Sequence, residues 1–135
     1  MPTPWPDDLT IETQVGQMFD NAGGDQMAMA TVKRTGLVNS VVFYPNWSMS
    51  GANTNSRTYT LYNRGQSGAG TAVVATLALT SGVNLSKGVS KTITLGAAAD
   101  RVVAIGDVLE WQSLHVLTGL PDPGGRVVIQ QTHTT

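Results

Sequence analysis

The stretch GQSGAGT at residues 65–71 carries three glycines before a hydroxyl residue, a composition that could form a phosphate-binding loop. A P-loop also requires a lysine beside the terminal hydroxyl, and a helix whose N-terminus faces the phosphate. Here Thr71 is followed by AVVATLALT, an alternating pattern typical of a strand, and the lysine is missing. The pattern therefore predicts a long hairpin whose glycines permit positive φ, and no nucleotide site.

Other residue types that perform catalysis are few and scattered. His115 falls in a predicted strand and His133 in the C-terminal tail, and neither has a nucleophile or carboxylate at a recognisable spacing. We interpret His115 as a packed or interface residue. Asp100, Asp107 and Asp122 match no EF-hand spacing, so a calcium site is kept only as an alternative to turn-capping roles for Asp100 and Asp107. We expect no cofactor, and a small β-barrel enzyme is the least favoured class.

The composition narrows the class of protein further. The chain has 135 residues, enough for one domain, and only 13% are charged, against about 25% in an ordinary soluble domain. A net charge of −1 offers no basic surface for nucleic acid, and the absence of cysteine excludes disulfides and thiolate metal sites. No run approaches the ~18 apolar residues of a membrane span, and the N-terminus lacks the pattern of a signal peptide.

The first 25 residues differ in character from the rest. Residues 1–8 contain three prolines, which remove backbone donors and hold the chain extended. Residues 9–19 have both helical spacing and strand-forming residue types, so helix and strand remain open there. The sequence NAGG at residues 21–24 ends whichever element precedes it. We expect an extended N-terminal arm over residues 1–25 and one β domain over residues 26–135.

Eight later segments have strand character, and Gly or Pro separates them. They are residues 27–33, 37–44, 58–63, 71–80, 91–95, 101–105, 108–116 and 126–131. Alternation is clean in KTITL, where Ile93 and Leu95 share one face and Thr92 and Thr94 share the other. This pattern predicts an all-β fold, a single β-sandwich or jelly-roll-like domain.

Two of these strands, 71–80 and 108–116, appear apolar on both faces, which is typical of a strand covered by another subunit. We therefore predict oligomer or partner contacts at Val74, Ala78 and Trp111. A further candidate contact is Trp47, in the long polar loop at residues 45–57. Three roles for Trp47 are kept: stacking on a sugar, inserting into a protein partner, and filling the core.

Several of these stretches resemble one known family. They are TNSRTYTLYNRG, the glycine-rich hairpin after it, the turn from Val103 to Leu109, and the turn from Pro123 to Val127. Across residues 40–130, about two thirds of the chain, the sequence is similar to the small decoration (cement) proteins on the capsids of tailed phages, particularly phages of actinobacteria. These features are patterns of turns and strands, and none of them is a catalytic signature.

The resemblance implies a β-sandwich or β-tulip subunit that acts as a homotrimer on the outer capsid surface of an HK97-fold shell. It also implies that the major capsid protein is the partner and that the N-terminal arm reaches it. The arm residues expected to contact the capsid are Pro4, Trp5, Pro6, Leu9 and Ile11. We expect a virion protein that is made in the host cytoplasm and stabilises the shell. The alternative is a tail or head-fibre adhesion module that binds host glycans through the 45–57 loop.

Overall fold

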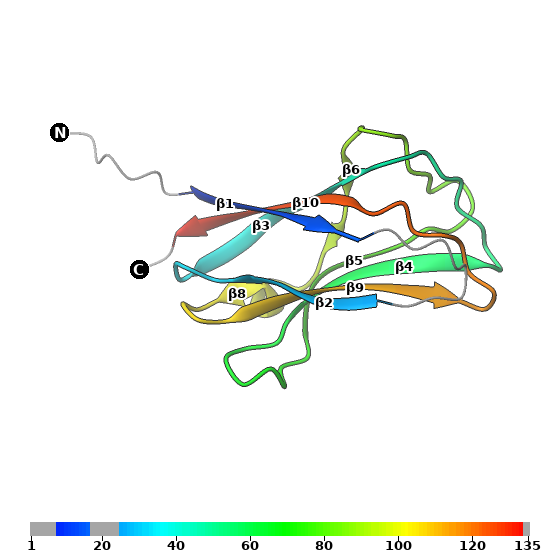
Figure 1. Cartoon of the computed structure of the whole chain (residues 1–135). Coiled ribbons are helices and arrows are strands. Elements are labelled where there is room, and N and C mark those ends of the chain that lie inside the picture. The colour runs from blue at the N-terminus through cyan, green and yellow to red at the C-terminus, as the bar shows by residue number, and fades with distance from the viewer. Residues whose placement is uncertain (1–7, 17–24, 134–135) are drawn as a thin grey trace.

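The computed structural model describes residues 8–16 and 25–133, which form two antiparallel β-sheets packed face to face (Figure 1). The elements are β1 (Asp8–Val15), β2 (Asp25–Thr31), β3 (Gly36–Pro45), β4 (Ser56–Asn63), β5 (Ala72–Ala78), β6 (Lys91–Thr92), β7 (Thr94–Leu95), the 3₁₀ turn η1 (Ala98–Arg101), β8 (Val102–Val103), β9 (Val108–Val116) and β10 (Gly125–His133). The first sheet has the order β1-β10-β3-β6, with β8 also paired to β3, and the second has the order β2-β9-β4-β5-β7. The predicted fold class, a jelly-roll-like β-sandwich, is confirmed. No helix in the described part of the chain is long and apolar enough to cross a membrane.

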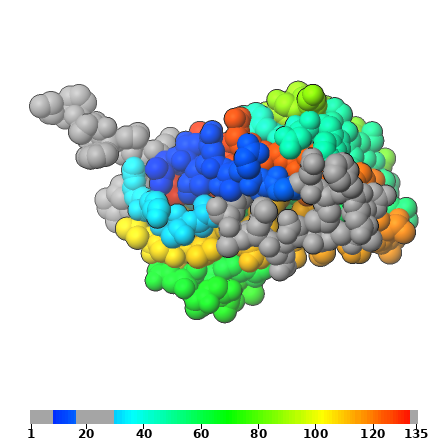
Figure 2. Space-filling view, in the orientation of Figure 1, coloured from blue at the N-terminus to red at the C-terminus, as the bar shows by residue number. Residues whose placement is uncertain are grey.

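The first strand lies within the sandwich. Residues Asp8–Val15 pair with β10 in unbroken register, from Asp8 opposite Thr132 to Val15 opposite Gly125. Ile11 packs against the core and Val15 is part of it, and the pairing with β10 decides for strand over helix in this segment. The blue atoms of β1 also form part of the surface in Figure 2. The structure therefore differs from the predicted boundary after residue 25, because this sheet begins at Asp8. Residues 1–7 lie outside the described part of the chain.

The segment predicted as one strand over residues 91–95 serves both sheets. β6 pairs with β3 of the first sheet, whereas β7 pairs with β5 of the second. Between them, the Ile93 amide donates to the Val41 carbonyl at 2.9 Å, and the Ile93 side chain is buried. Thr92 and Thr94 are exposed, which confirms the predicted alternation. This crossing closes one side of the sandwich, because a single extended segment joins its two edges.

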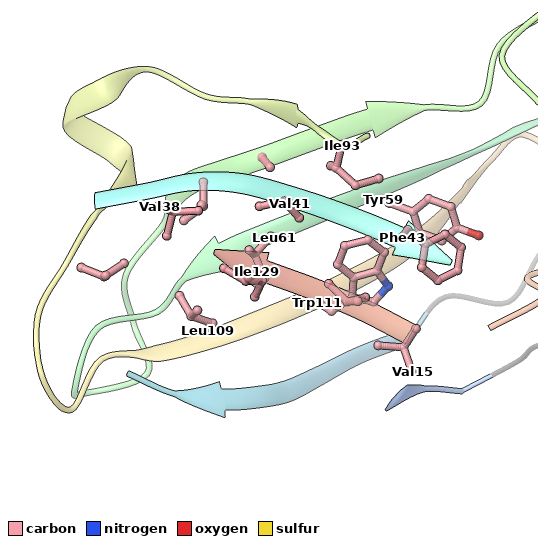
Figure 3. Packing of buried hydrophobic residues seen from close by; sticks show 14 of the residues in the cluster. Val15, Val38, Val41, Phe43, Tyr59, Leu61, Ile93, Leu109, Trp111 and Ile129 are labelled. Atoms are coloured by element: carbon pink, nitrogen blue, oxygen red, sulfur yellow. The ribbon is translucent and has the colours of Figure 1, made fainter. Parts of the chain in front are cut away.

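Three aromatic rings pack against one another in the core, and Figure 3 shows Phe43, Tyr59 and Trp111 lying together. Phe43 comes from β3 of the first sheet, whereas Tyr59 and Trp111 come from β4 and β9 of the second. Their ring centroids are 5.0 to 5.6 Å apart, and all three side chains are buried. Aromatic pairs at this spacing add to the energy of apolar burial. The trio therefore packs the first sheet against the second.

Strand β5 does not have the two apolar faces that its sequence predicts. Its register with β4 shifts between Leu61 and Tyr62, so that Val74 is an additional residue on β5. A β-bulge of this kind places two consecutive residues on the same side of the strand. Val74 and Ala75 are accordingly both buried, and Thr76 is exposed on the outer face. The strict alternation of buried and exposed side chains fails in β5, because the bulge at Val74 shifts the alternation by one residue.

The glycine-rich stretch forms the predicted hairpin between β4 and β5, which projects from the body of the sandwich (Figure 1). Gly65 has a φ of 66° and Gly68 a φ of 82°, conformations that residues with a side chain rarely adopt. Gly70 is required for another reason, since a Cβ on it would lie 2.7 Å from the carbonyl oxygen of Asn63. A strand, β5, follows Thr71, as predicted, where a P-loop would continue into a helix.

Valine at Gly68 or Gly70 is expected to destabilise the protein. Gly68→Val should lower the free energy of unfolding by about 1–2 kcal/mol because of backbone strain. Gly70→Val should cost more, because the new side chain would collide with backbone atoms. Urea unfolding measures both changes, and Ala69→Val, at an exposed position of the same hairpin, is the control. An unchanged unfolding midpoint for Gly70→Val would contradict this explanation.

Candidate functional site

The long loop at residues 45–57 is fixed to the segment that follows β5. Met49 and Leu85 exchange two backbone hydrogen bonds, of 2.9 and 2.8 Å. The side-chain oxygen of Asn84 accepts a hydrogen bond from the Gly51 amide at 2.9 Å. Gly51 has no room for a side chain, because a Cβ would lie 2.1 Å from the carbonyl oxygen of Thr80. These contacts therefore hold the 45–57 loop in one arrangement against the segment that follows β5.

The segment between β9 and β10 joins the same surface. The backbone amide of Asn46 donates to the Gly124 carbonyl at 3.0 Å, and its side-chain amide donates to the Pro123 carbonyl at 3.2 Å. Three loops therefore meet at one end of the sandwich, on the right in Figure 1. Trp47, in the first of these loops, is half-buried. The result is a pre-ordered surface rather than a loose loop.

A cluster of buried polar side chains lies at the same end. The Nε of Arg57 donates to the Leu120 carbonyl at 2.7 Å, and its Nη1 donates to the Ser113 hydroxyl at 2.9 Å. The Tyr59 hydroxyl donates to Asp122 Oδ1 at 2.9 Å. All four side chains in these contacts are almost fully buried. Because buried polar groups are costly when unpaired, this cluster holds the 117–124 segment against β4 and β9.

Asp122 also orders its own turn, since its Oδ1 accepts the Gly124 amide at 2.9 Å. Burial, and secondarily the neighbouring Asp122 carboxylate, raise the pKa of the Tyr59 hydroxyl well above its ordinary value. A phenol held neutral in this way is a hydrogen-bond donor at all ordinary pH values. The arrangement is that of a structural anchor, because the hydroxyl is buried away from any substrate.

The stability of the protein is expected to fall in alkaline solution through Tyr59. In the unfolded chain, tyrosine loses its proton as the pH rises through about 10, whereas the raised pKa of Tyr59 keeps the folded state protonated. Above that pH the unfolded state alone gains from deprotonation, so stability present below pH ~10 is lost. This one group should contribute up to about 1.4 kcal/mol per pH unit. Urea unfolding at several alkaline pH values should give a steeper decline for the wild type than for Tyr59→Phe; equal slopes would refute this assignment.

The structure brings few of the predicted contact residues together. Val74 and Trp111 lie in the core of their own chain, where neither side chain can reach a partner, and this differs from the prediction. Ala78 is exposed on the outer face of β5. Leu9 and Ile11 are half-buried in β1. Trp47 is half-buried in its loop, and the predicted contacts at residues 4–6 lie outside the described part of the chain.

The aspartates considered for calcium do not converge. Asp107 accepts hydrogen bonds from the Ala104 amide and from the Asn63 side chain, both at 2.9 Å, which confirms its predicted role in a turn. Asp122 binds Tyr59 instead. Tyr59 and Asn63 are four residues apart on β4, about 13 Å along a strand. In the described residues, no group of three His, Cys, Asp or Glu side chains could hold a metal ion.

The sequence predicted an apolar outer face for residues 108–116, but the contact residue named there was Trp111, and the exposed apolar residues lie at the end of β9. Leu114 is 44% exposed, Val116 41% and Leu117 65%. His115, between them, is half-buried, and its Nδ1 lies 2.7 Å from the Leu117 carbonyl. Because side chains alternate between the two faces of a strand, Leu114 and Val116 lie on the face opposite to the buried Trp111. The sequence alone shows this separation. The sequence did not show which of the two faces is covered.

Taken together, two face-to-face antiparallel sheets, one side closed by a crossing segment and three loops ordered at one end define a jelly-roll-like β-sandwich protein. No family model matches the chain, and no curated protein matches it.

Among solved structures, the chain is similar to the crystal structure of the infectious bursal disease virus VP2 subviral particle. The TM-score is 0.51 and the identity 14%, over 96% of this chain and 33% of that one. Structures of the Gx and Gt strains of the same virus align with TM-scores of 0.43 and 0.39, at 13% and 15% identity, over 93% and 94% of this chain and 32% and 30% of theirs. The chain thus spans about a third of the length of the structures it matches. The first likeness establishes a shared fold.

Proposed function

We propose that this protein is a structural, non-enzymatic component of a viral capsid. The more specific proposal is a phage head decoration (cement) protein. It binds the outer surface of an HK97-fold shell as a trimer and stabilises that shell. The observation that carries the proposal is the β-sandwich itself, whose fold is shared with a protein of a virus particle. The sequence resemblance to decoration proteins over residues 40–130 points in the same direction.

The construction of the sandwich supports this role. Catalysis requires reactive groups that reach a substrate, whereas the most strongly interacting polar groups here, Arg57, Tyr59 and Asp122, are buried and pair with the protein itself. A cement protein needs a rigid body with stable surfaces, which the hydrogen-bonded loops provide. The low content of charged residues is compatible with close contact between neighbouring protein surfaces.

The proposed capsid contact is the segment that precedes β1, with Trp5 as its anchor. Because β1 is occupied in pairing with β10, Leu9 and Ile11 belong to the body, and the contact moves toward residues 1–7. Prolines there restrict φ in advance, so less chain entropy is lost on binding. A buried aromatic anchor can contribute about 2 kcal/mol or more to binding.

Deletion of residues 2–7 is expected to leave the sandwich folded but to weaken its attachment to capsids that lack the protein. Trp5→Ala should lose part of the same affinity, and Thr3→Ala is the matched control in the same segment. Co-sedimentation of each variant with undecorated capsids measures attachment, and circular dichroism verifies folding. Unchanged attachment of the truncated protein would rule out this contact, and failure of the wild type to bind any such capsid would refute the proposed function.

A tail or head-fibre adhesion module is the second candidate function. The observation that favours it is the pre-ordered surface of three loops around the half-buried Trp47. Ordered loops at one end of a sandwich are a common place for binding sites. Binding of the isolated protein to host glycans, lost in Trp47→Ala and accompanied by no affinity for capsids, would favour this function over capsid decoration.

A further inference from the structure

We infer that the outer face of the second sheet is a contact surface between copies of this chain. The surface, here called the threonine face, consists of two neighbouring rows across β9, β4 and β5. Its residues are Leu114, Thr58 and Ala78 in one row and Gln112, Thr60 and Thr76 in the other. This inference deepens the proposed function, since it assigns the surface through which the proposed copies meet.

The threonine face contains no charged side chain in either row. Thr58 is directly opposite Leu114 on one side and Ala78 on the other, and both of these neighbours are exposed. Thr60 is likewise opposite Gln112 and Thr76, and Thr76 is exposed. The two rows therefore present uncharged side chains, of which Leu114, Ala78 and Thr76 are exposed, whereas Thr60 between them is only 7% exposed.

Two of the polar side chains on this face, Thr60 and Thr76, already have hydrogen-bond partners within the chain. The hydroxyls of Thr60 and Thr76 are 3.1 Å apart, and the Thr76 hydroxyl also donates to the Tyr59 carbonyl at 3.1 Å. Beside these rows, Arg64 and Glu110 form an ion pair of 2.9 Å. Excluding water from these paired groups carries a small desolvation cost, and the Gln112 and Thr58 side chains would pair across the contact.

The apolar end of the face carries a second, independent signal. Next to Leu114 lie Val116 and Leu117, and all three side chains are exposed by two fifths or more. Leu117 has a φ of 56°, the one positive φ among non-glycine residues in the described chain. A bulky residue held in this conformation is strained, and such residues concentrate at binding sites. Leu117 combines this conformation with a side chain that is 65% exposed.

Charge distinguishes a second copy from another kind of partner. The outer face of the first sheet carries exposed charges, Glu12 on β1 and Arg126 on β10, the latter stacked 4.6 Å from the centre of the Tyr44 ring. A charged partner would be attracted to the outer face of the first sheet, because the threonine face carries no unpaired charge. A face without net charge does not repel its own copy, and apolar groups at its end favour association. These observations together favour a second copy as the occupant.

The test is self-association of the purified full-length chain, without any capsid, by sedimentation equilibrium and native mass spectrometry. The wild type is expected to associate at tens of micromolar. The double variant Ala78→Lys/Leu114→Lys, which places charges at both ends of one row, should associate at least about tenfold more weakly. Gln130→Lys, at an exposed position on the first sheet, should associate like the wild type. Circular dichroism and thermal unfolding verify that every variant is folded.

A wild type that stays monomeric, or a double variant that associates like the wild type, would overturn the inference. If Gln130→Lys weakens association equally, the effect is one of general charge, and the inference also fails. Should the double lysine variant fail to fold, Thr76→Lys, a single exposed change on the same face, replaces it with the same expected loss. Because capsid attachment is measured separately, its absence would remove the proposed function without altering the result on self-association.

Discussion

Replacement of Trp111 by alanine is expected to lower the free energy of unfolding by about 3–5 kcal/mol. Trp111 is 2% exposed and packs 5.1 Å from the ring centre of Tyr59 and 5.6 Å from that of Phe43. Its loss would open a cavity where the two sheets meet, and the neighbouring strands can close it only in part. The effect should therefore appear in the isolated chain, independent of any oligomer.

Urea unfolding of two further variants sharpens this prediction. Trp111→Phe should cost less than Trp111→Ala, because it keeps a ring and removes an Nε1 group that is buried without a hydrogen-bond partner in the described residues. Leu114→Ala, three positions along the same strand and 44% exposed, should change stability by about 0.5–1 kcal/mol at most. If Trp111→Ala unfolds like the wild type yet loses self-association, Trp111 is an interface residue and the packing described here is wrong.

Replacement of Asp122 by alanine is expected to cost about 3 kcal/mol or more of stability. The change would leave the Tyr59 hydroxyl and the Gly124 amide without their acceptor. It would also remove a negative charge from a buried region that contains the guanidinium group of Arg57. A buried donor without an acceptor has lost its hydrogen bond to water and forms no other. Leaving it unpaired therefore costs more stability than a single hydrogen bond contributes.

A double-mutant cycle with Tyr59→Phe separates this mechanism from simple loss of packing. Tyr59→Phe should cost about 1 kcal/mol in the wild type and close to zero in the Asp122→Ala background, since the hydroxyl has lost its acceptor there. Asp122→Asn, which keeps a carbonyl oxygen for both donors, should be less destabilised than Asp122→Ala. Additive effects of the two changes, measured by urea unfolding, would show that the Tyr59–Asp122 hydrogen bond contributes nothing to stability.

The amino-acid sequence by itself determined where most strands lie and how the hairpin between β4 and β5 is built. Strands β3, β4, β9 and β10 coincide with predicted segments to within two residues. Alternation of apolar and polar residues is a local property, because one face of each strand is buried. The positive φ of Gly65 and Gly68 is local too, since it depends on the absence of a side chain at that residue.

Only the tertiary structure decided which face of each strand is covered and which strands pair. The bulge at Val74 placed two consecutive residues inside, the segment at residues 91–95 was divided between two sheets, and Asp8–Val15 joined β10. Trp111 lies inside and Leu114 outside, although both fit a predicted contact strand. These outcomes depend on partners that are distant in the sequence. Register and burial are set by the packing of the whole sandwich, and a short window of residues does not contain that information.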